Sequence, residues 1–322
     1  MGKWISAFFL LVSVLWLSAC GPAGPKEEKP PFLRMEDSAG RTVTLDRQPE
    51  RVILLSPSFI NIWEAAGGDF IAWADSPLTD VPEGAEGKET VGYLYQVNVE
   101  KTVSLRPDLV VGLNGLHNRL VPALESSGIS VILLSLSDYG DVQETLRLFA
   151  QMTGKPDKGK EAAAALEASM EKARRQAPDV PVTAAVVHST AGAVTSEIQK
   201  TIASDCLEQL HVKNVMAEKI NPSAGKRPPV SLEILAESDP GVIFITSMGT
   251  DEQVENQLRA ALTGQPAWRE LKAVRTGHVY ALPDELFLVN PGMNYPEALS
   301  FMAEKLNRGA VSAEKSGAES WE

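Results

Sequence analysis

Short apolar runs, each followed by a polar turn and then by a helical pattern, constrain the fold of this chain more than any other feature. The first run, Arg51–Leu55, meets the turn Ser56-Pro57-Ser58 and then an apolar stripe at helical spacing that begins at Phe59. Further apolar runs of strand length recur along the chain, at 70–74, 109–112, 131–134, 182–187, 242–246 and 279–282. Strand, turn and helix in this order are typical of parallel α/β folds. The sequence therefore predicts an α/β protein.

Two helical segments divide these runs into two groups. Residues 141–153 are predicted as a helix that Asp141 caps and Gly154 ends. A longer helix is predicted from Pro156 to Pro178, and its roughly twenty residues would reach about 30 Å, the width of a small lobe. We expect this helix to join two lobes as a rigid rod, although it could instead be a surface helix of a single domain.

The predicted domains follow from this division. The N-terminal α/β lobe covers residues 32–140 and opens with a hairpin around Ser38-Ala39-Gly40. Residues 141–178 are expected to be the connecting helices, and residues 179–308 the C-terminal α/β lobe. Residues 309–322 show no periodicity, so we expect a frayed tail there.

One stretch of the first lobe is echoed in the second. In residues 97–111 and again in 230–244, a glutamate stands in the first turn of a short predicted helix, seven residues before a proline that precedes a buried strand. These glutamates are Glu100 and Glu233. Each would gain about 0.3 to 1 kcal/mol from the helix dipole, so both could be simple caps. Two equivalent caps would also present one negative charge on each lobe, which favours a docking role.

The amino terminus has the features of an export signal followed by a tether. In residues 1–19, Lys3 precedes an apolar run, Ile5–Leu17, that would span roughly 20 Å. A permanent transmembrane helix is the weaker interpretation, because the hydrocarbon core of a bilayer is ~30 Å thick. Proline-rich residues 20–31 are predicted to form an extended tether.

The predicted signal ends in Leu17-Ser18-Ala19-Cys20-Gly21. This segment resembles the lipobox of bacterial lipoproteins, in which the cysteine is acylated, for example with palmitate, and becomes the mature N-terminus. The resemblance implies lipidation at Cys20. We therefore expect a protein that is anchored by this lipid to the extracytoplasmic face of the cell membrane.

Composition and motifs argue against several classes of function. The formal charge of −12, from 42 acidic and 30 basic side chains, argues against nucleic acid as a partner. Only two cysteines occur, Cys20 and Cys206, which excludes a multi-disulfide scaffold and a zinc site of paired thiolates. The four histidines are far apart in sequence and indicate no bare metal site. We expect no enzymatic activity, since the sequence has no phosphate loop, G-x-S-x-G or H-E-x-x-H motif.

Several short motifs occur in a specific order behind the lipobox: Arg51-Val-Ile-Leu-Leu-Ser-Pro-Ser58, Val91-Gly92 through Asn98-Val-Glu100, Leu105-Arg-Pro-Asp-Leu-Val-Val111, Ser231-Leu-Glu233, Pro266-Ala-Trp268, Leu271-Lys-Ala-Val274, Gly277-His-Val-Tyr280 and Leu286-Phe-Leu-Val-Asn-Pro-Gly292. Together they resemble the helical-backbone, class III substrate-binding proteins of bacterial ABC importers, the group that captures iron-siderophores, haem and cobalamin. The resemblance covers roughly residues 40 to 307.

The resemblance implies a fold, partners and a ligand. The fold would be two Rossmann-like lobes joined by one long helix, with the ligand in a cleft between the lobes. Glu100 and Glu233 would meet arginines on the membrane permease, which works with an ATPase. The ligand would be an iron or cobalt chelate, no cofactor is implied, and we expect a monomer.

Ligand contacts in α/β lobes come from the loops that follow the carboxyl ends of the strands. The expected ligand-binding residues on these loops are Ser58, Phe59, Trp73, Tyr93, Tyr95, Asn114, His117, Tyr139, His188, Met248, Phe287 and Asn290. Aromatic and amide walls suit a large planar ligand or chelate with polar edges, although each aromatic could instead belong to the core. His117 or His188 could ligate haem iron. Arg119 and Arg227 are candidate rim residues.

These observations lead to one main expectation and two alternatives. We expect the extracytoplasmic component of an ABC importer that captures a ferric chelate, siderophore or haem, and delivers it to the permease. A cobalamin-binding protein of the same fold is the first alternative. A sensory or structural lipoprotein with no transport role is the second.

Overall fold

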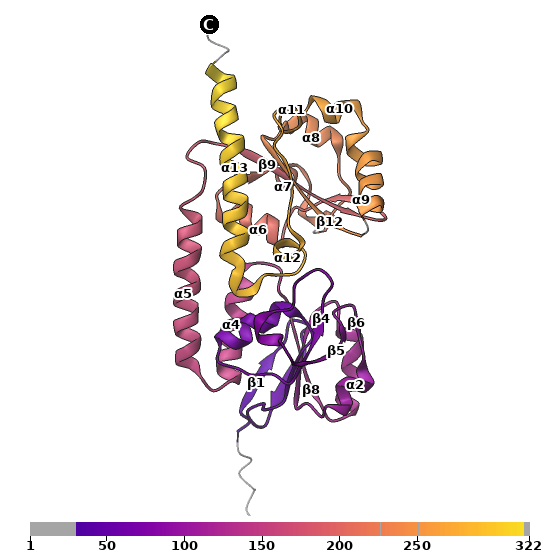
Figure 1. Cartoon of the computed structure of the whole chain (residues 1–322), viewed down its shortest axis with the longest axis vertical. Coiled ribbons are helices and arrows are strands. Elements are labelled where there is room, and N and C mark those ends of the chain that lie inside the picture. The colour runs from indigo at the N-terminus through magenta and orange to yellow at the C-terminus, as the bar shows by residue number, and fades with distance from the viewer. Residues whose placement is uncertain (1–29, 226, 250, 319–322) are drawn as a thin grey trace, which may run out of the picture.

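The computed structural model describes residues 30–225, 227–249 and 251–318. It has two α/β lobes, one above the other in Figure 1, with helices α5 (Pro156–Arg174) and α13 (Tyr295–Ala318) side by side along one edge. Helix α4 (Tyr139–Met152) leads from the first lobe into α5, which in turn leads into the first strand of the second lobe. The expected two-lobe α/β fold with a long connecting helix is therefore confirmed.

The first lobe is built on a sheet in the strand order β6-β5-β4-β3-β7-β8, parallel except for β6. Its strands are β3 (Val52–Leu54), β4 (Ala72–Asp75), β5 (Glu89–Tyr93), β6 (Gln96–Val97), β7 (Leu109–Leu113) and β8 (Ser130–Leu134). Its helices are α1 (Ile60–Ala65), α2 (Val99–Ser104) and α3 (Val121–Ser126). Leu54 and its neighbour Ile53 belong to different apolar clusters. Both faces of the sheet are thus buried, as is usual for parallel sheets.

The second lobe has a smaller sheet in the order β10-β9-β12-β13, and β11 also pairs with β9. Its strands are β9 (Thr183–Thr190), β10 (Val194–Ser196), β11 (Lys213–Asn214), β12 (Val242–Met248) and β13 (Val279–Ala281). Its helices are α6 (Ile202–Gln209), α7 (Val215–Lys219), α8 (Leu232–Ser238), α9 (Asp251–Leu258), α10 (Pro266–Glu270), α11 (Lys272–Arg275) and α12 (Asp284–Phe287). Strands β9, β12 and β13 are parallel, and β10 is antiparallel to β9.

The largest apolar cluster is shared by the two lobes and the helices that connect them. It includes Trp63 of α1, Phe149 of α4, Met170 of α5, Phe244 of β12 and Met302 of α13. The lobes are therefore joined by a continuous core as well as by the chain.

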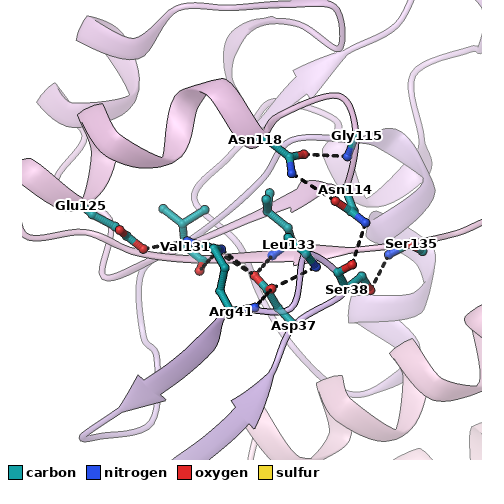
Figure 2. Close-up of polar contacts among 11 residues, drawn as sticks. Asp37, Ser38, Arg41, Asn114, Gly115, Asn118, Glu125, Val131, Leu133 and Ser135 are labelled. Atoms are coloured by element: carbon teal, nitrogen blue, oxygen red, sulfur yellow. Dashed lines mark hydrogen bonds and ion pairs between the residues drawn. The ribbon is translucent and has the colours of Figure 1, made fainter.

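A hairpin of β1 (Leu33–Glu36) and β2 (Thr42–Leu45) is fixed to the edge of the first sheet through Asp37 (Figure 2). The buried Asp37 carboxylate accepts hydrogen bonds from Arg41, through Nη2 at 2.7 Å, and from the Leu133 backbone at 3.2 Å. Burial raises the pKa of Asp37, but these hydrogen bonds outweigh it and hold the pKa below its usual range. The hairpin expected around Ser38-Ala39-Gly40 is thus confirmed.

Three helix boundaries differ from the expectation, and one of them is the end of α5, at Arg174 instead of near Pro178. Helix α4 begins at Tyr139, because Asp138 is the cap and its side chain accepts from the Asp141 backbone at 2.9 Å. The last helix continues to Ala318 instead of fraying after residue 308. Alanine, glutamate and lysine in that segment are good helix formers, and no proline interrupts them.

The described part of the chain contains no helix that is both long and apolar enough to cross a membrane. The predicted signal of residues 1–19, Cys20 and most of the 20–31 tether lie outside the described residues.

Candidate functional site

A tight turn between β5 and β6 presents two tyrosines at the carboxyl end of the first sheet. Tyr93 pairs with Gln96 across this turn, and residues Tyr93 and Tyr95 are 55% and 45% exposed. Gly92, just before the turn, has a φ of +105°, and a Cβ there would lie 2.5 Å from the Gln96 carbonyl oxygen. Glycine is therefore required for the turn that carries both rings.

His117 holds this turn from inside the lobe. Its Nδ1 accepts from the Leu113 backbone N–H at 2.8 Å, so the proton is on Nε2, which donates to the Leu94 carbonyl at 2.9 Å. Burial is the main cause that lowers the pKa of His117, and the ring is neutral at physiological pH. Both ring nitrogens are thus engaged, and His117 has none left for a haem iron. His117 instead positions the turn of residues 93–96 between β5 and β6, which we call the tyrosine turn.

A buried ionic cluster lies at the end of β9 in the second lobe. The Glu197 side chain is 1% exposed and binds Arg227 Nη2 at 2.7 Å. The Thr246 hydroxyl donates to Glu197 at 3.0 Å and therefore accepts from His188 Nδ1–H at 2.8 Å. His188 Nε2 then keeps its lone pair toward Arg227 Nη1 at 3.5 Å. We name His188, Glu197, Arg227 and Thr246 the ionic cluster.

Burial, followed by the Arg227 charge, lowers the pKa of His188 to about 4, although the Glu197 charge opposes this. The ring is therefore neutral and almost fully enclosed. With Thr246 and Arg227 lying against its two nitrogens, His188 has no nitrogen open to a haem iron in this arrangement of the cluster.

The tyrosine turn and the ionic cluster lie on the facing sides of the two lobes. Burial raises the pKa of the Tyr95 phenol, and the Arg227 guanidinium is near enough to oppose that shift. Arg119 Nη2 donates to the Tyr95 carbonyl at 3.4 Å and has no carboxylate partner among the described residues. Met248, at the carboxyl end of β12, is 37% exposed. Figure 1 shows β6 and β12 on the sides where the lobes approach each other.

We define the candidate site as this interlobe surface, formed by Tyr93, Tyr95, Arg119, Arg227 and Met248. It combines aromatic and thioether surface with two guanidinium groups. Such a surface can stack on a flat or ring-bearing molecule and bind carboxylate or other anionic groups at its edge.

The structure places four of the expected ligand-facing aromatics in the core. Phe59, Trp73, Tyr139 and Phe287 are each at most 3% exposed. The Tyr139 hydroxyl donates to Glu167 at 2.8 Å, while the Phe287 ring packs on Phe301 at 6.1 Å between centroids. Residues near the carboxyl end of a strand can face either the ligand or the helices that cover the sheet. Their position in the sequence therefore could not distinguish these two surroundings. We therefore leave them out of the candidate site.

Two polar residues of the expected set hold backbone segments in place, and a third is buried. Asn114 donates to the Ser38 carbonyl at 2.7 Å and fixes the hairpin turn (Figure 2). Asn290 bridges the lobes, donating to the Leu136 carbonyl at 3.3 Å and accepting from the Gly292 N–H at 2.8 Å. Ser58 is buried in the turn that follows β3. The Asn114 and Asn290 side chains hold the fold and Ser58 is enclosed, so we do not place these three residues in the candidate site.

Glu100 and Glu233 occupy equivalent places in their lobes. Each is exposed and stands two residues after a capping side chain, Asn98 for α2 and Ser231 for α8. Neither glutamate forms an ion pair within the described residues. The predicted first-turn positions are confirmed, and docking to a permease stays a prediction.

Among the described residues, no group of three or more His, Cys, Asp or Glu side chains converges. Sequence reasoning missed Glu197. The only signal for it would have been its place just after β10, beside β9, the strand that carries His188 and ends at Thr190.

Comparison with known proteins gives the family. Residues 52–286 match a family described as periplasmic binding protein. The chain belongs to this family. The assignment to the substrate-binding proteins of ABC importers is thereby confirmed.

Relatives and solved structures resemble most of the chain. The probable siderophore-binding lipoprotein YfiY of Bacillus subtilis is 26% identical over 313 residues, 91% of this chain and 94% of YfiY. A cobalamin-binding protein of Halobacterium salinarum is 26% identical over 290 residues, 85% of this chain and 77% of that protein. The structure of Staphylococcus aureus IsdE complexed with heme has a TM-score of 0.68 at 16% identity, covering 80% of this chain and 98% of IsdE.

Proposed function

We propose that this periplasmic binding protein captures a ferric chelate, a siderophore or haem, outside the cytoplasm and delivers it to the permease of an ABC importer. The observation that carries the proposal is the pair of exposed tyrosines, Tyr93 and Tyr95, on the turn of one lobe, with the Arg227 charge of the other lobe opposing the rise in the Tyr95 pKa. A molecule bound there would touch both lobes at once. Ferric chelates offer both features that this surface recognises, ring systems and anionic edges.

Cobalamin is the second candidate ligand. It is favoured by the similarity to the cobalamin-binding protein of Halobacterium salinarum, at the same identity as the siderophore-binding relative. The corrin macrocycle is large and polar at its rim, so aromatic and thioether surface would suit it as well.

The cellular setting belongs to the same proposal. Cys20 would carry lipid and hold the protein, a monomer, at the outer surface of the membrane, near a permease and its ATPase. Two relatives of Bacillus subtilis, YhfQ and YfiY, are named as lipoproteins. The protein would bind and release its ligand without chemical conversion.

A titration of the full chain, purified in mild detergent, tests the proposal. Tryptophan fluorescence is followed while haemin, ferric citrate or cyanocobalamin is added. We expect saturable quenching by a ferric chelate, because Trp63, Trp73 and Trp268 are buried in the two lobes. Quenching by cyanocobalamin alone would favour the second candidate. If none of the three binds, the proposed function is wrong for these ligand classes, and a sensory or structural role gains support.

A further inference from the structure

Arg227 has two roles that compete with each other. Its guanidinium is the counter-ion of Glu197, whose side chain is only 1% exposed. The Arg227 side chain is itself 38% exposed, and its charge acts to lower the pKa of the Tyr95 phenol on the opposite lobe. A buried carboxylate that loses its cation is strongly disfavoured. Any ligand anion that draws Arg227 toward the interlobe surface therefore needs a second cation to replace it at Glu197.

His188 is the group placed to supply that cation. Its Nδ1 lies 3.6 Å from Glu197 Oε1, and its Nε2 lone pair faces Arg227. The flanking strands place Thr195 and Thr246 opposite it, and α9 reaches the neighbouring Ser189 through the Val254 carbonyl. Among the described residues, the charges that act on His188 are those of Arg227 and Glu197. Its protonation therefore depends on where Arg227 lies.

The backbone around Arg227 limits how this residue can move. The Pro228 carbonyl accepts from the Ser196 N–H at 2.8 Å, and Pro229 bridges to Thr195 of β10. The main chain is thus fixed against the sheet just after Arg227. The long Arg227 side chain can change partners while Pro228 and Pro229 stay in place.

We propose that Arg227 couples capture of an anionic ligand to protonation of His188. An anionic group on the ligand draws the guanidinium away from Glu197, and Nε2 of His188 takes up a proton from solvent. The imidazolium then neutralises Glu197. This inference rests on the proposed function and narrows it to chelates that carry carboxylate or a comparable anion.

The consequence for pH has a definite sign. The complex binds one more proton than the free protein, so affinity rises as pH falls. Affinity depends on pH in the range between two values of the His188 pKa. The upper limit is the pKa in the complex, and the lower limit is the pKa of about 4 in the free protein. Within this range, affinity would change by up to about tenfold for each pH unit.

The first experiment needs no ligand. The imidazole signals of the full chain in detergent micelles are titrated by NMR, and His188 is identified with His188→Gln. We expect Arg227→Gln to raise the His188 midpoint by about one pH unit or more, since it removes a cation beside the ring. Arg227→Lys should leave it low. The matched control Arg269→Gln, which removes an exposed charge of α10, should also leave it unchanged.

The second experiment counts protons. Calorimetry at pH 5.5, in two buffers of different ionisation enthalpy, is run with ferric citrate, haemin and cyanocobalamin. We expect a net uptake of roughly 0.5 to 1 proton with the carboxylate-bearing chelates. Glu197→Gln should abolish this uptake, because the buried negative charge that retains the proton is gone. Glu197→Gln also tests the proposal if the Arg227→Gln variant does not fold.

The outcomes separate this inference from the proposed function. Binding of a carboxylate chelate with no proton exchange overturns the inference and leaves the proposed function intact. An unchanged His188 midpoint in folded Arg227→Gln overturns it as well. Binding of cyanocobalamin alone rejects the anionic ligand class while keeping a transport role. Failure of all three ligands rejects the proposed function for these classes, and the inference with it.

Discussion

Tyr95 connects the two halves of the candidate site, because it stands on the first lobe and lies within the electrostatic reach of Arg227 on the second. We predict that Tyr95→Ala weakens binding of the ferric chelate by about tenfold or more, a loss of ~1.4 kcal/mol, since stacking surface disappears while the turn is retained. The measurement is the tryptophan-quenching titration. Phe32→Ala, which removes another exposed ring of the same lobe, is the control and should bind normally. Equal affinity of the Tyr95 variant and the wild type would remove this residue from the site.

The histidines show what sequence can and cannot say at the residue scale. The sequence places His117 on a loop and His188 just after a strand, whereas the structure has His117 directly before the helical turn Asn118–Leu120 and His188 within β9. Their roles depend on which partners their ring nitrogens meet, namely Leu94 and Leu113 for His117, and Thr246 and Arg227 for His188. Such contacts join residues distant in the chain. Glu197 was missed for the same reason, since only the folded lobe shows that it is buried.

Helices α2 and α8 each direct one first-turn glutamate, Glu100 or Glu233, toward solvent. We predict that replacing both by alanine lowers uptake in cells by at least about tenfold while leaving ligand affinity unchanged, because exposed charges chiefly set the rate and register of docking. Uptake of the labelled chelate and fluorescence titration measure the two properties. The control pair Glu86→Ala and Glu208→Ala removes one exposed glutamate from each lobe elsewhere. Weaker ligand binding by the Glu100 and Glu233 variant would contradict the docking assignment.

Among the elements, those buried on both faces could be predicted and the peripheral ones could not. Strands β3, β7, β8, β9 and β12 appear in the sequence as continuous apolar runs because helices cover both sides of their sheets. Strand β5 begins with the exposed Glu89 and Thr90, and β6 and β11 have only two residues each. Their positions depend on neighbouring strands. The sequence therefore indicates Tyr93 and Tyr95 as candidate ligand contacts, but it does not predict the β5–β6 hairpin that carries them.

At the scale of the whole molecule, the shared core ties the two lobes into one unit. The cluster that contains Phe149, Met170 and Met302 reaches from the first sheet to the second. A polar contact adds to it, because the Tyr295 hydroxyl on α13 donates to Asp205 of α6 at 2.6 Å, and Asp205 also accepts from the Tyr139 backbone at 3.3 Å. Two lobes joined in this way should move little on binding, which suits a rigid ligand.

This continuity predicts a single unfolding transition for both lobes. In urea, circular dichroism and tryptophan fluorescence should follow one curve, because neither lobe can lose its half of the core alone. Tyr295→Phe leaves the half-buried Asp205 carboxylate without the donor that the buried Tyr295 supplies, and should lower the free energy of unfolding by about 1 to 3 kcal/mol, shifting both probes equally. Tyr93→Phe, which removes a hydroxyl from an exposed ring, should not shift them. Two separate transitions, or a shift in one probe only, would mean that the lobes unfold independently and that α4, α5 and α13 link them without coupling their stability.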